Sequence, residues 1–555
     1  MKQFFALVAA LWIQFVCPEQ LRCQAQIIPA YDLGGASQPK PDLSFRKERQ
    51  YKRVHQSSLR LILRNQIDKT ERFLNQYLDK YPDDAETLYM LGILHGQGGD
   101  LAKAEDFLAR AIKAGLPPSR LVAGPREMFE PLRETELVKR LHAEFAHKPV
   151  HGPLVGDVTD STASFWVRTQ SESEVQVVVS ESQDLRNGIT SESVSSSAED
   201  DYTAVVRVSG LKPSTEYYYG VRIGDGLVQK SPNQKFRAPP PSGKAAKFAI
   251  AFGGGAGYVP ENERMWDTIG GFDPLAILLL GDNVYIDDPE SVVMQQYTYH
   301  RRQSRPEWRK LTSRSAVYTI WDDHDFSTND SWGGADIDLP FWKQDWVFPI
   351  FRQNWANPGY GGGDGQPGCW YKFSIADVDF IMLDCRYYRT DPEQSPRTML
   401  GPVQLAWLKE QLTSATGTFK IVCSSVPWDF RTKGDSLDTW NGYKREHEEI
   451  LSFIEKQEID GVLLMSADRH RSDAWKIRRP NGYDLYEFNS SRLTNQHIHP
   501  KMKKAGAIFS YNAPQSFGLV TFDTTAEDPT ATYEVVNIAG QKPHSITVKR
   551  SELTR

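Results

Sequence analysis

The strongest constraint on the fold is an apolar run at residues 276–280 that stops abruptly at a glycine and an aspartate. The run reads AILLL and leads into GDNVYIDD at residues 281–288. Five consecutive apolar residues predict a strand that is buried on both faces. Gly281 permits a tight turn, so Asp282 and Tyr285 are expected at the carboxyl edge of the strand, where layered α/β domains bind their ligands.

The same arrangement occurs twice more along the chain. The apolar run at residues 316–321 is followed by DDHD at residues 322–325, and the run at residues 461–465 is followed by SADRH at residues 466–470. One strand that ends in aspartate carries little information, but three strands with carboxylate or imidazole ends can converge on one site. The sequence therefore predicts a metal centre at the carboxyl ends of these strands.

Length and charge narrow the class of protein. At 555 residues the chain is too long for one ordinary core, and roughly three domains are expected. The formal net charge is −6, with 25% charged residues. This near balance and the lack of a basic stripe in the sequence argue against a nucleic-acid-binding protein.

The first 25 residues have the pattern of a secretory signal peptide. Lys2 provides the positive start, residues 4–16 form the apolar core, and Ala25 suits the last position before cleavage, with Cys23 two residues earlier. We therefore expect a secreted or periplasmic protein whose mature chain begins near Gln26.

Two alternatives to cleavage remain open. A retained membrane anchor would need about 20 apolar residues, more than this core offers, and a lipoprotein signal at Cys17 would follow the ill-suited Val16. After cleavage only Cys369, Cys385 and Cys423 remain, which is not a disulfide framework. No later apolar stretch is long enough to span a bilayer, so we expect a mature protein without a membrane span.

Residues 26–58 are expected to be a linker, and residues 59–145 have a helical pattern. This region resembles one tetratricopeptide repeat, which consists of two helices joined by a turn. The spacing of the repeat is matched by LG at residues 91–92, Ala104 and Ala111, and a GGD turn lies between the two helices. One or two such units cannot form an open array. The helices either pack on the rest of the protein or offer a surface to a protein partner.

Residues 150–241 change to short alternating segments, such as residues 163–168, separated by polar turns. This pattern predicts a β-sandwich of about 90 residues. One segment resembles the corner of fibronectin type III domains, in which a tyrosine fixes a loop to its strand. It consists of LKP at residues 211–213 and the strand-like residues 215–221. PPPSG at residues 239–243 is the stiff linker that follows.

Residues 245–536 alternate strands with helices and predict a layered α/β domain, followed by a C-terminal tail at residues 537–555. Further apolar runs of strand length lie at residues 248–252, 380–383 and 420–423. Residues 404–412 have helical spacing. Residues 359–368 contain six glycines and are expected to form a rim or lid of the active site.

Four motifs in this domain resemble those of the PhoD-like alkaline phosphatase and phosphodiesterase family, within the calcineurin-like metallophosphatases. They are GDNVY at residues 281–285, WDDHD with Asn329, LDCR at residues 383–386 and SADRH at residues 466–470. The resemblance extends from about residue 150 to near residue 536, since this family also has an N-terminal fibronectin-like sandwich. It implies two mixed sheets flanked by helices, with a metal cluster at the strand ends.

The resemblance also implies a ligand set for two or more metal ions. Asp282 would bridge two ions and Tyr285 would bind one through its phenolate, and the implied set is completed by Asp322, Asn329, Asp468 and His470. These donors are mostly hard oxygens, which suit Ca²⁺, Mn²⁺ or Fe³⁺ better than a structural zinc. We expect Ca²⁺ with Fe³⁺, Mn²⁺ or Zn²⁺.

Two departures from the family pattern stand out. The first strand of the family usually ends in Ser-Cys, the cysteine being an iron ligand, and here Phe252 and Gly253 take that place. Loss of the thiolate weakens the case for Fe³⁺, while the glycines at residues 253–255 can instead bring backbone N–H groups towards a phosphate. Ala467 replaces a usual glycine, which is a small change.

Three residues are expected to act on the substrate. His324, oriented by one of the carboxylates before it, such as Asp323, would steady the transition state or protonate the leaving group. Arg386, Arg389 and Arg471 are candidates to clamp the substrate phosphate. Two of the three are expected to be paired within the protein, and Arg386 is the one assigned to the substrate.

Other polar residues have simpler interpretations. His497 and His499 are potential metal donors, but a polar loop is the favoured interpretation. Ser466 is expected outside the reacting groups, because a direct attack needs no covalent intermediate.

The resulting hypothesis is an exported phosphoesterase that hydrolyses phosphate esters by in-line attack of a metal-bound hydroxide. Metal coordination lowers the pKa of water from about 15.7 to about 7. Two alternatives stay open: a metal-dependent hydrolase of another ester class, and a non-catalytic surface interaction protein with a structural metal.

Overall fold

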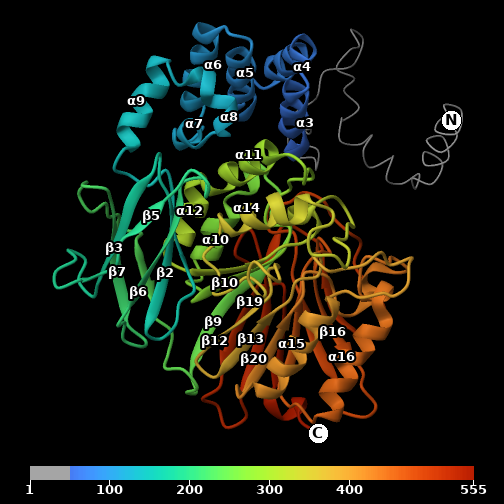
Figure 1. Cartoon of the computed structure of the whole chain (residues 1–555). Helices are drawn as coiled ribbons and strands as arrows, with labels where there is room; N and C mark the ends of the chain where they lie inside the picture. The colour runs from blue at the N-terminus through green and yellow to red at the C-terminus, as the bar shows by residue number, and fades with distance from the viewer. Residues whose placement is uncertain (1–50) are drawn as a thin grey trace, which may run out of the picture. The chain divides into compact units, whose positions relative to one another are not determined.

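The computed structural model describes residues 51–555. The predicted signal peptide and most of the predicted linker at residues 26–58 therefore lie outside the described residues. The chain divides into two compact units, one comprising Met1–Leu116 with Met128–Leu137 and the other Pro117–Glu127 with Val138–Arg555. Figure 1 shows the helices and strands of both units along the chain.

The first unit is helical, as predicted, but its helices begin at Tyr51 rather than residue 59. Its elements are α3 (Tyr51–Leu63), α4 (Ile67–Lys80), α5 (Ala85–Gln97), α6 (Leu101–Lys113) and the short η2 (Glu130–Leu132). The side chain of Asp84 caps α5 by accepting the backbone N–H of Thr87 at 3.0 Å. A Cβ on Gly92 of α5 would lie 2.5 Å from Leu108 of α6, so glycine is needed for the close packing of these helices.

The second unit begins with short helices and an antiparallel β domain. The helices are α7 (Ser119–Ala123), α8 (Arg126–Phe129) and α9 (Glu136–Phe145). The strands are β1 (His151–Gly156), β2 (Thr162–Arg168), β3 (Ser173–Ser180), β4 (Ile189–Thr190), β5 (Val194–Ser196), β6 (Thr203–Ser209), β7 (Glu216–Ile223) and β8 (Lys235–Arg237). The hydroxyl of Tyr217 accepts the backbone N–H of Lys212 at 2.8 Å, which is the tyrosine contact that the sequence predicted.

The two faces of this β domain belong to different sheets. One is a five-stranded sheet, in which β3 pairs with β4, β5 and β7, and β7 pairs with β8. The other consists of β1, β2 and β6, which continue the main sheet of the α/β domain, since β1 pairs in parallel with β11 through Gly156 and Val317. The β domain is thus built into the α/β domain rather than closed as a separate sandwich.

Two mixed sheets form the α/β domain, as expected. The nine-stranded sheet has the order β21-β20-β19-β9-β10-β11-β1-β2-β6 and adds β9 (Lys247–Gly253), β10 (Ala276–Leu280), β11 (Ala316–Ile320), β19 (Ser516–Asp523), β20 (Thr530–Asn537) and β21 (His544–Lys549). The seven-stranded sheet has the order β12-β13-β14-β15-β17-β16-β18, from β12 (Tyr371–Ile375), β13 (Val378–Met382), β14 (Phe419–Cys423), β15 (Val462–Ser466), β16 (Ser472–Ile477), β17 (Leu485–Asn489) and β18 (Ala507–Tyr511).

The C-terminal residues 537–555 do not form the predicted tail. They supply β21, which pairs along its length with β20 at the edge of the nine-stranded sheet. Along HSITVK, His544 and Ile546 are half-buried, Val548 is buried and the residues between them are exposed, an alternation that suits an edge strand but is a weak signal in a sequence. A 3₁₀ turn, η7 (Arg550–Leu553), follows this strand.

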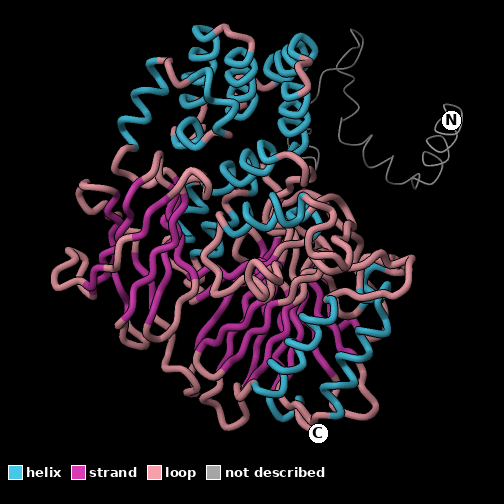
Figure 2. Tube along the Cα trace, viewed as in Figure 1, coloured by secondary structure: helices cyan, strands magenta, loops and turns pink. Residues whose placement is uncertain are grey.

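The helices of this domain are α10 (Met265–Gly270), α11 (Val292–Gln303), α12 (Pro306–Thr312), α13 (Asp323–Phe326), α14 (Phe348–Arg352), α15 (Gly401–Ser414) and α16 (Lys444–Lys456), with the shorter η3 (Pro260–Asn262), η4 (Lys343–Val347), η5 (Phe430–Lys433) and η6 (Trp440–Tyr443). Figure 2 shows the strands of the domain at its centre, with helices beside them. No helix among residues 51–555 is long and apolar enough to cross a membrane.

Alternate residues of the central strands enter different cores. Ile421 and Leu463 lie in the core that both sheets share, whereas Val422 and Leu464 pack against the apolar faces of α15 and α16. This period of two explains why these strands read as continuous apolar runs, because both of their faces are buried. Burial of both faces also fixes the positions of these strands, and therefore the positions of the residues at their carboxyl ends.

Candidate metal centre and active site

The backbone at the strand ends is shaped to bring carboxylates together. Asp282 follows β10, Asp322 follows β11, and a Cβ on Gly281 would lie 2.4 Å from the Cβ of Asp322. Asp282, Asp468 and His470 have φ angles of 53°, 63° and 47°, a left-handed conformation that costs energy for residues other than glycine. Such strain at three predicted ligands marks this edge as a candidate functional site.

One group of polar contacts links Asp282 to His470. The hydroxyl of Tyr285 donates to Asp282 Oδ2 at 2.7 Å, and the amide of Asn495 donates to that hydroxyl at 2.7 Å. The same amide lies 3.4 Å from Nδ1 of His470. Burial raises the pKa of Asp282 well above its usual value, and the neighbouring carboxylates raise it further. Asn495 is a member of this group that the sequence analysis missed.

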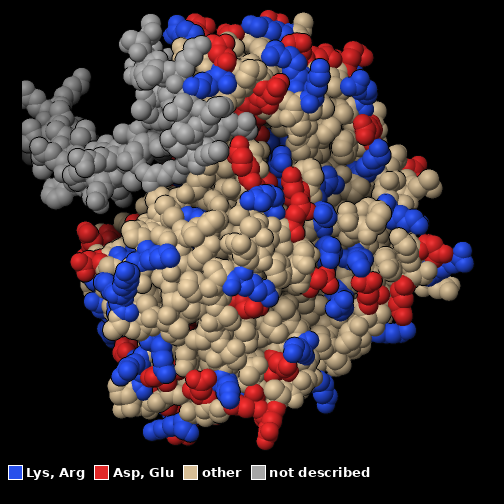
Figure 3. All heavy atoms as spheres, turned by 180° about the vertical axis from the view of Figure 1, so that it is seen from behind, with Lys and Arg blue, Asp and Glu red and all other residues tan. Residues whose placement is uncertain are grey.

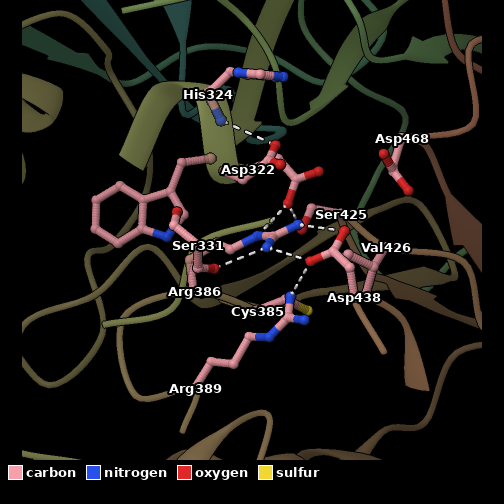
Figure 4. Close-up of polar contacts among 12 residues, drawn as sticks. Asp322, His324, Ser331, Cys385, Arg386, Arg389, Ser425, Val426, Asp438 and Asp468 are labelled. Carbon is pink, nitrogen blue, oxygen red and sulfur yellow. Dashed lines mark hydrogen bonds and ion pairs between the residues drawn. The ribbon is translucent and has the colours of Figure 1, made fainter. Parts of the chain in front are cut away.

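A second group surrounds Asp322. Its Oδ1 accepts hydrogen bonds from Arg386 Nε at 2.6 Å and from the hydroxyl of Ser425 at 2.8 Å. The guanidinium of Arg386 also contacts Asp438 at 2.7 Å, and Arg389 lies 2.8 Å from the same carboxylate. Figure 4 shows Arg386 extended between Asp322 and Asp438.

The charges of this group are mutually compensated. Burial opposes ionisation of Asp438, but Arg386, Lys433 and Arg389 outweigh it and hold the pKa of Asp438 well below its usual value. Arg386 is completely buried, so it holds carboxylates in place instead of facing a substrate phosphate as predicted. Arg389 and Arg471 are also paired within the protein, the latter with Asp473 at 2.7 Å.

His324 is oriented by a carboxylate other than the one expected. Its Nδ1 lies 2.5 Å from Asp287 Oδ1, and its ring packs at 4.5 Å from the ring of Tyr285, between centroids. Asp323 instead accepts the backbone N–H groups of His324 and Asp330. Asp287 belongs to the GDNVYIDD segment, so the sequence contained it without a signal for this contact.

Lys433 is a further cation that the sequence analysis missed. Its ammonium lies 2.5 Å from Asp438, 3.1 Å from Asp330 and 3.5 Å from Asp468. The predicted ligand Asn329 is exposed, and its neighbour Asp330 takes part in this group instead. Lys433 and Asp438 lie in the long segment between β14 and α16. No apolar run ends directly before either residue, so no sequence pattern indicated them.

The residues present fit a metal centre. Three sets of side chains place one ligand atom each within 4.8 Å of the others, and these sets are Asp282 with Asp323 and His324, Asp323 with Asp330 and Asp438, and His470 with His497 and His499. Among the described residues, the buried oxygens Asp282 Oδ1 and Asp322 Oδ2 have no hydrogen-bond partner. A buried carboxylate oxygen without a partner is costly, and a cation would compensate it.

The glycine run after β9 supplies no metal donor and no anion site. A Cβ on Gly253 would lie 2.9 Å from Leu493 Cδ2, and Cβ atoms on Gly254 and Gly255 would meet Ala467 and Arg492 at 2.7 and 2.9 Å. The backbone N–H groups of Gly254 and Gly255 donate to carbonyl groups of the protein. The alternative in which these N–H groups bind phosphate is therefore wrong.

The remaining predicted residues lie close to the site or behind it. The hydroxyl of Ser466 donates to buried Glu487, which supports its placement outside the reacting groups. His497 and His499 do not belong to an isolated polar loop, because their rings contact that of His470. On the face shown in Figure 3, acidic and basic side chains of the described residues are interspersed.

Comparisons with known proteins identify the family and the fold. The model of the PhoD-like phosphatase family matches residues 250–533, just over half of the chain, and a domain of unknown function, DUF7800, matches residues 147–241. Alkaline phosphatase D of Bacillus subtilis (strain 168) is 24% identical over 318 residues, which are 48% of this chain and 53% of that protein. The chain thus spans about half the length of this curated relative.

Two solved structures share the fold. The structure of PhoD has a TM-score of 0.60 and 16% identity, over 71% of this chain and 88% of that chain. A purple acid phosphatase, PPD1 from yellow lupin (Lupinus luteus) seeds, has a TM-score of 0.54 and 13% identity, over 74% of this chain and 76% of that chain.

Proposed function

The chain belongs to the PhoD-like phosphatase family, and from this premise we propose that it is a metal-dependent phosphoesterase of the alkaline phosphatase D type. Its substrates are phosphate esters, and the reaction is hydrolysis by in-line attack of water on phosphorus. The curated relative named alkaline phosphatase D and the two solved phosphatase structures support the reaction class.

One observation within the chain carries this proposal. Asp282 and Asp322 each have a buried oxygen without a hydrogen-bond partner among residues 51–555. Burial raises the pKa of both carboxyl groups, that of Asp322 to about 7, although Arg386 lowers it. Two buried acids that follow neighbouring strands and lack cationic partners at these oxygens are suited to hold metal ions rather than to stabilise the fold.

The residues that would hold the metal ions are those at the strand ends. They are Asp282, Tyr285, Asp322, Asp468 and His470, with Asp323 and Asp330 in place of the exposed Asn329. We expect two or more ions, Ca²⁺ together with Mn²⁺, Zn²⁺ or Fe³⁺. When bound, such ions supply positive charge and lower the pKa of water from about 15.7 to about 7.

The chain's own residues position these groups and move a proton. Arg386, Ser425 and Lys433 fix the carboxylates by the contacts given above, so that the donor oxygens keep their places when the charge of a substrate arrives. Asp287 engages Nδ1 of His324, which leaves Nε2 as the nitrogen that can give a proton to the leaving oxygen.

Three finer assignments belong to this proposal. The signal-like residues 1–25 support export to the periplasm or the medium. The contact between Tyr217 and Lys212 supports a corner of the fibronectin type III kind within the β domain. The packing of Gly92 against Leu108 supports a tetratricopeptide-like pair of helices that binds a protein partner.

Assays on the full-length protein with a phosphomonoester and a phosphodiester, beside elemental analysis, test the function. We expect turnover of at least one ester, loss of turnover on chelation, and recovery on metal addition. Asp282→Asn should abolish turnover, whereas Asp106→Asn, which changes an exposed carboxylate of α6 paired with Arg110, should retain it. A metal-loaded protein that hydrolyses neither ester would refute the proposal, and hydrolysis of a carboxylic ester alone would change the reaction class.

A further inference from the structure

Three histidines meet beside the candidate centre. His470 follows β15, while His497 and His499 lie in the segment between β17 and β18. The centroid of the His497 ring is 4.7 Å from the centroids of His470 and His499, and the latter two are 5.6 Å apart. One ring nitrogen of each lies within 4.8 Å of the others.

These separations fit three imidazoles around one tetrahedral ion. With Zn–N bonds of about 2.0–2.1 Å, three ring centroids around zinc are expected about 5 Å apart. The observed values of 4.7, 4.7 and 5.6 Å bracket that figure. The ring nitrogens, which lie within 4.8 Å of one another, would have to move closer together to bind one ion.

The backbone that carries the three rings is fixed by hydrogen bonds. Ser491 accepts the N–H of His470 at 2.9 Å, and the side chain of Asn495 accepts the N–H of His497 at 3.3 Å. Asn512 donates to the carbonyl of His499 at 3.0 Å. The segment between β17 and β18 is therefore held so that its two histidines stay close to His470.

The chemistry of the donors selects the ion. No carboxylate belongs to this set of three, whereas the sets that contain Asp282 and Asp438 are rich in oxygen. The nearby cations Arg469 and Arg471 are paired with Asp468 and Asp473, so their charges are compensated. Neutral imidazoles suit borderline-soft ions such as Zn²⁺, and carboxylates suit Ca²⁺.

We propose that His470, His497 and His499 bind one zinc ion, next to but distinct from the oxygen-rich group around Asp282. His470 is then a ligand of this zinc ion and no longer of the ions around Asp282, whose ligand set keeps its oxygen donors. The amide of Asn495 joins the two groups, because it contacts both Tyr285 and His470. The proposal goes beyond the phosphoesterase function and is tested without an activity assay.

The experiment uses the full-length protein, freed of metal by chelation and reloaded with Zn²⁺ alone or Ca²⁺ alone. Zinc X-ray absorption should show three imidazole nitrogens at about 2.0–2.1 Å. Loss of an outer-shell partner typically weakens metal binding by about 10- to 100-fold. His497→Gln and His499→Gln each remove a ligand, so each should weaken zinc binding by more than that. Their affinity for Ca²⁺ should stay unchanged. His147→Gln, which changes a histidine beside Ile223, is the matched control and should bind zinc normally.

Circular dichroism and thermal melting check that each variant is folded. Replacement of zinc by Co²⁺ in the wild-type protein gives an independent test, because four-coordinate Co²⁺ has an intense visible spectrum. Zinc affinity within about threefold of wild type in both glutamine variants, or absorption data without imidazole scattering, would overturn the proposal. Zinc bound by three imidazoles in a protein without phosphoesterase activity would support this site and refute the proposed function.

Discussion

Nδ1 of His324 lies 2.5 Å from Oδ1 of Asp287, and both residues are buried. This contact joins the segment after β10 to the start of α13. The backbone N–H of Ile286 also donates to the carbonyl of His324 at 3.0 Å, so the two segments are fixed to each other by main chain as well as side chain. Asp287 is thus a positioning residue, which holds the imidazole in one orientation and one tautomer.

Asp287→Asn should slow turnover without removing metal. The amide keeps the shape of the side chain but accepts from Nδ1 less strongly, so the imidazole loses its fixed tautomer. The rate should fall by at least about tenfold, up to the 10²–10⁴ that a general acid contributes. The loss should be largest for esters with poor leaving groups, which depend most on protonation.

Steady-state kinetics over a series of leaving groups, beside elemental analysis, measure this effect. Asp106→Asn serves as the control for loss of an exposed carboxylate. An equal loss for good and poor leaving groups would show that Asp287 does not act through proton transfer.

Asp282→Asn should damage metal binding far more than His324→Ala does. Asp282 is expected to bridge two cations, and one charge pair at about 4 Å is worth about 4 kcal/mol at an effective dielectric constant near 20. His324 acts after the metals are bound, so its alanine variant should keep most of its metal and lose about 10²–10⁴ in rate. Elemental analysis and kinetics on the same preparations decide between these roles. Metal loss in His324→Ala as complete as in Asp282→Asn would make His324 a ligand.

The sequence predicted the strands and their ends because both depend on local patterns. AILLL suits a strand that is buried on both faces, and Gly281, with a φ of 98°, allows the chain to turn where that strand ends. The predicted residues Asp282, Tyr285 and His470 therefore lie in one group of contacts.

The parts that the sequence did not predict depend on long-range pairing. Lys433 and Asp438 reach the site from a loop without a strand pattern, and Asp287 is one of two adjacent aspartates of which only the fold selects one. The merging of β1 with β11 is likewise invisible in the sequence, because the pairing of strands from separate regions leaves no local pattern.

The protein should bind mainly divalent ions. Leu493 fills the space where a side chain at residue 253 would lie, so no thiolate is available to favour Fe³⁺. Elemental analysis should find little iron. A purple or brown protein with full iron occupancy and a phenolate-to-iron absorption band would contradict this prediction.

Gly253→Cys should therefore destabilise the protein without recruiting iron. Its Cβ would lie 2.9 Å from Leu493 Cδ2, and overpacking of this kind costs about 1–3 kcal/mol. Thermal melting of Gly253→Cys and of the double variant with Leu493→Ala measures the effect, since the smaller residue should restore part of the loss.

Removal of residues 26–145 should preserve turnover and lower stability. No predicted ligand lies in this region, so a chain that begins near Val150 should keep its rate within a fewfold. It loses Arg126, however, whose Nε lies 2.9 Å from buried Asp201. The loss of one charged hydrogen bond is worth about 1.5–3 kcal/mol.

Arg126→Ala in the full-length protein is the matched control for this truncation. It should reproduce part of the loss in thermal stability, because Asp201 keeps its contacts with Arg168 and His300 in both proteins. A folded, metal-loaded truncation without turnover would show that the helices shape the site.

Metal affinity should rise with pH through about 7. Without metal, burial raises the pKa of Asp322 to about 7, while its value in the unfolded chain is near 3.8. Metal binding needs the ionised carboxylate, so protons are released as metal binds. Calorimetry in two buffers of different ionisation enthalpy should count these protons at pH 6 and find fewer at pH 8. A metal affinity that does not change between pH 5.5 and pH 7.5 would contradict the assignment of Asp322 as a ligand.

The same titration predicts the stability of the metal-free protein. Between about pH 4 and pH 7 the unfolded chain has lost the proton of Asp322 and the folded chain retains it, so the free energy of unfolding falls as the pH rises. A bound cation keeps Asp322 ionised, so the free energy of unfolding no longer decreases with pH for this reason. The melting temperature of the chelated protein should therefore decrease from pH 5 to pH 8 by more than that of the loaded protein.

Glu487 provides the control for this comparison. Burial raises its pKa to about 7 as well, but it accepts hydrogen bonds from Ser466 and from the backbone of Trp428, and it is not one of the predicted ligands. Glu487→Gln should change the pH dependence of the melting temperature equally in the chelated and the loaded protein. The difference in melting temperature between the two proteins should then keep its dependence on pH. If that difference disappears in Glu487→Gln, the pH dependence does not report on Asp322, and the assignment of the metal-linked proton is wrong.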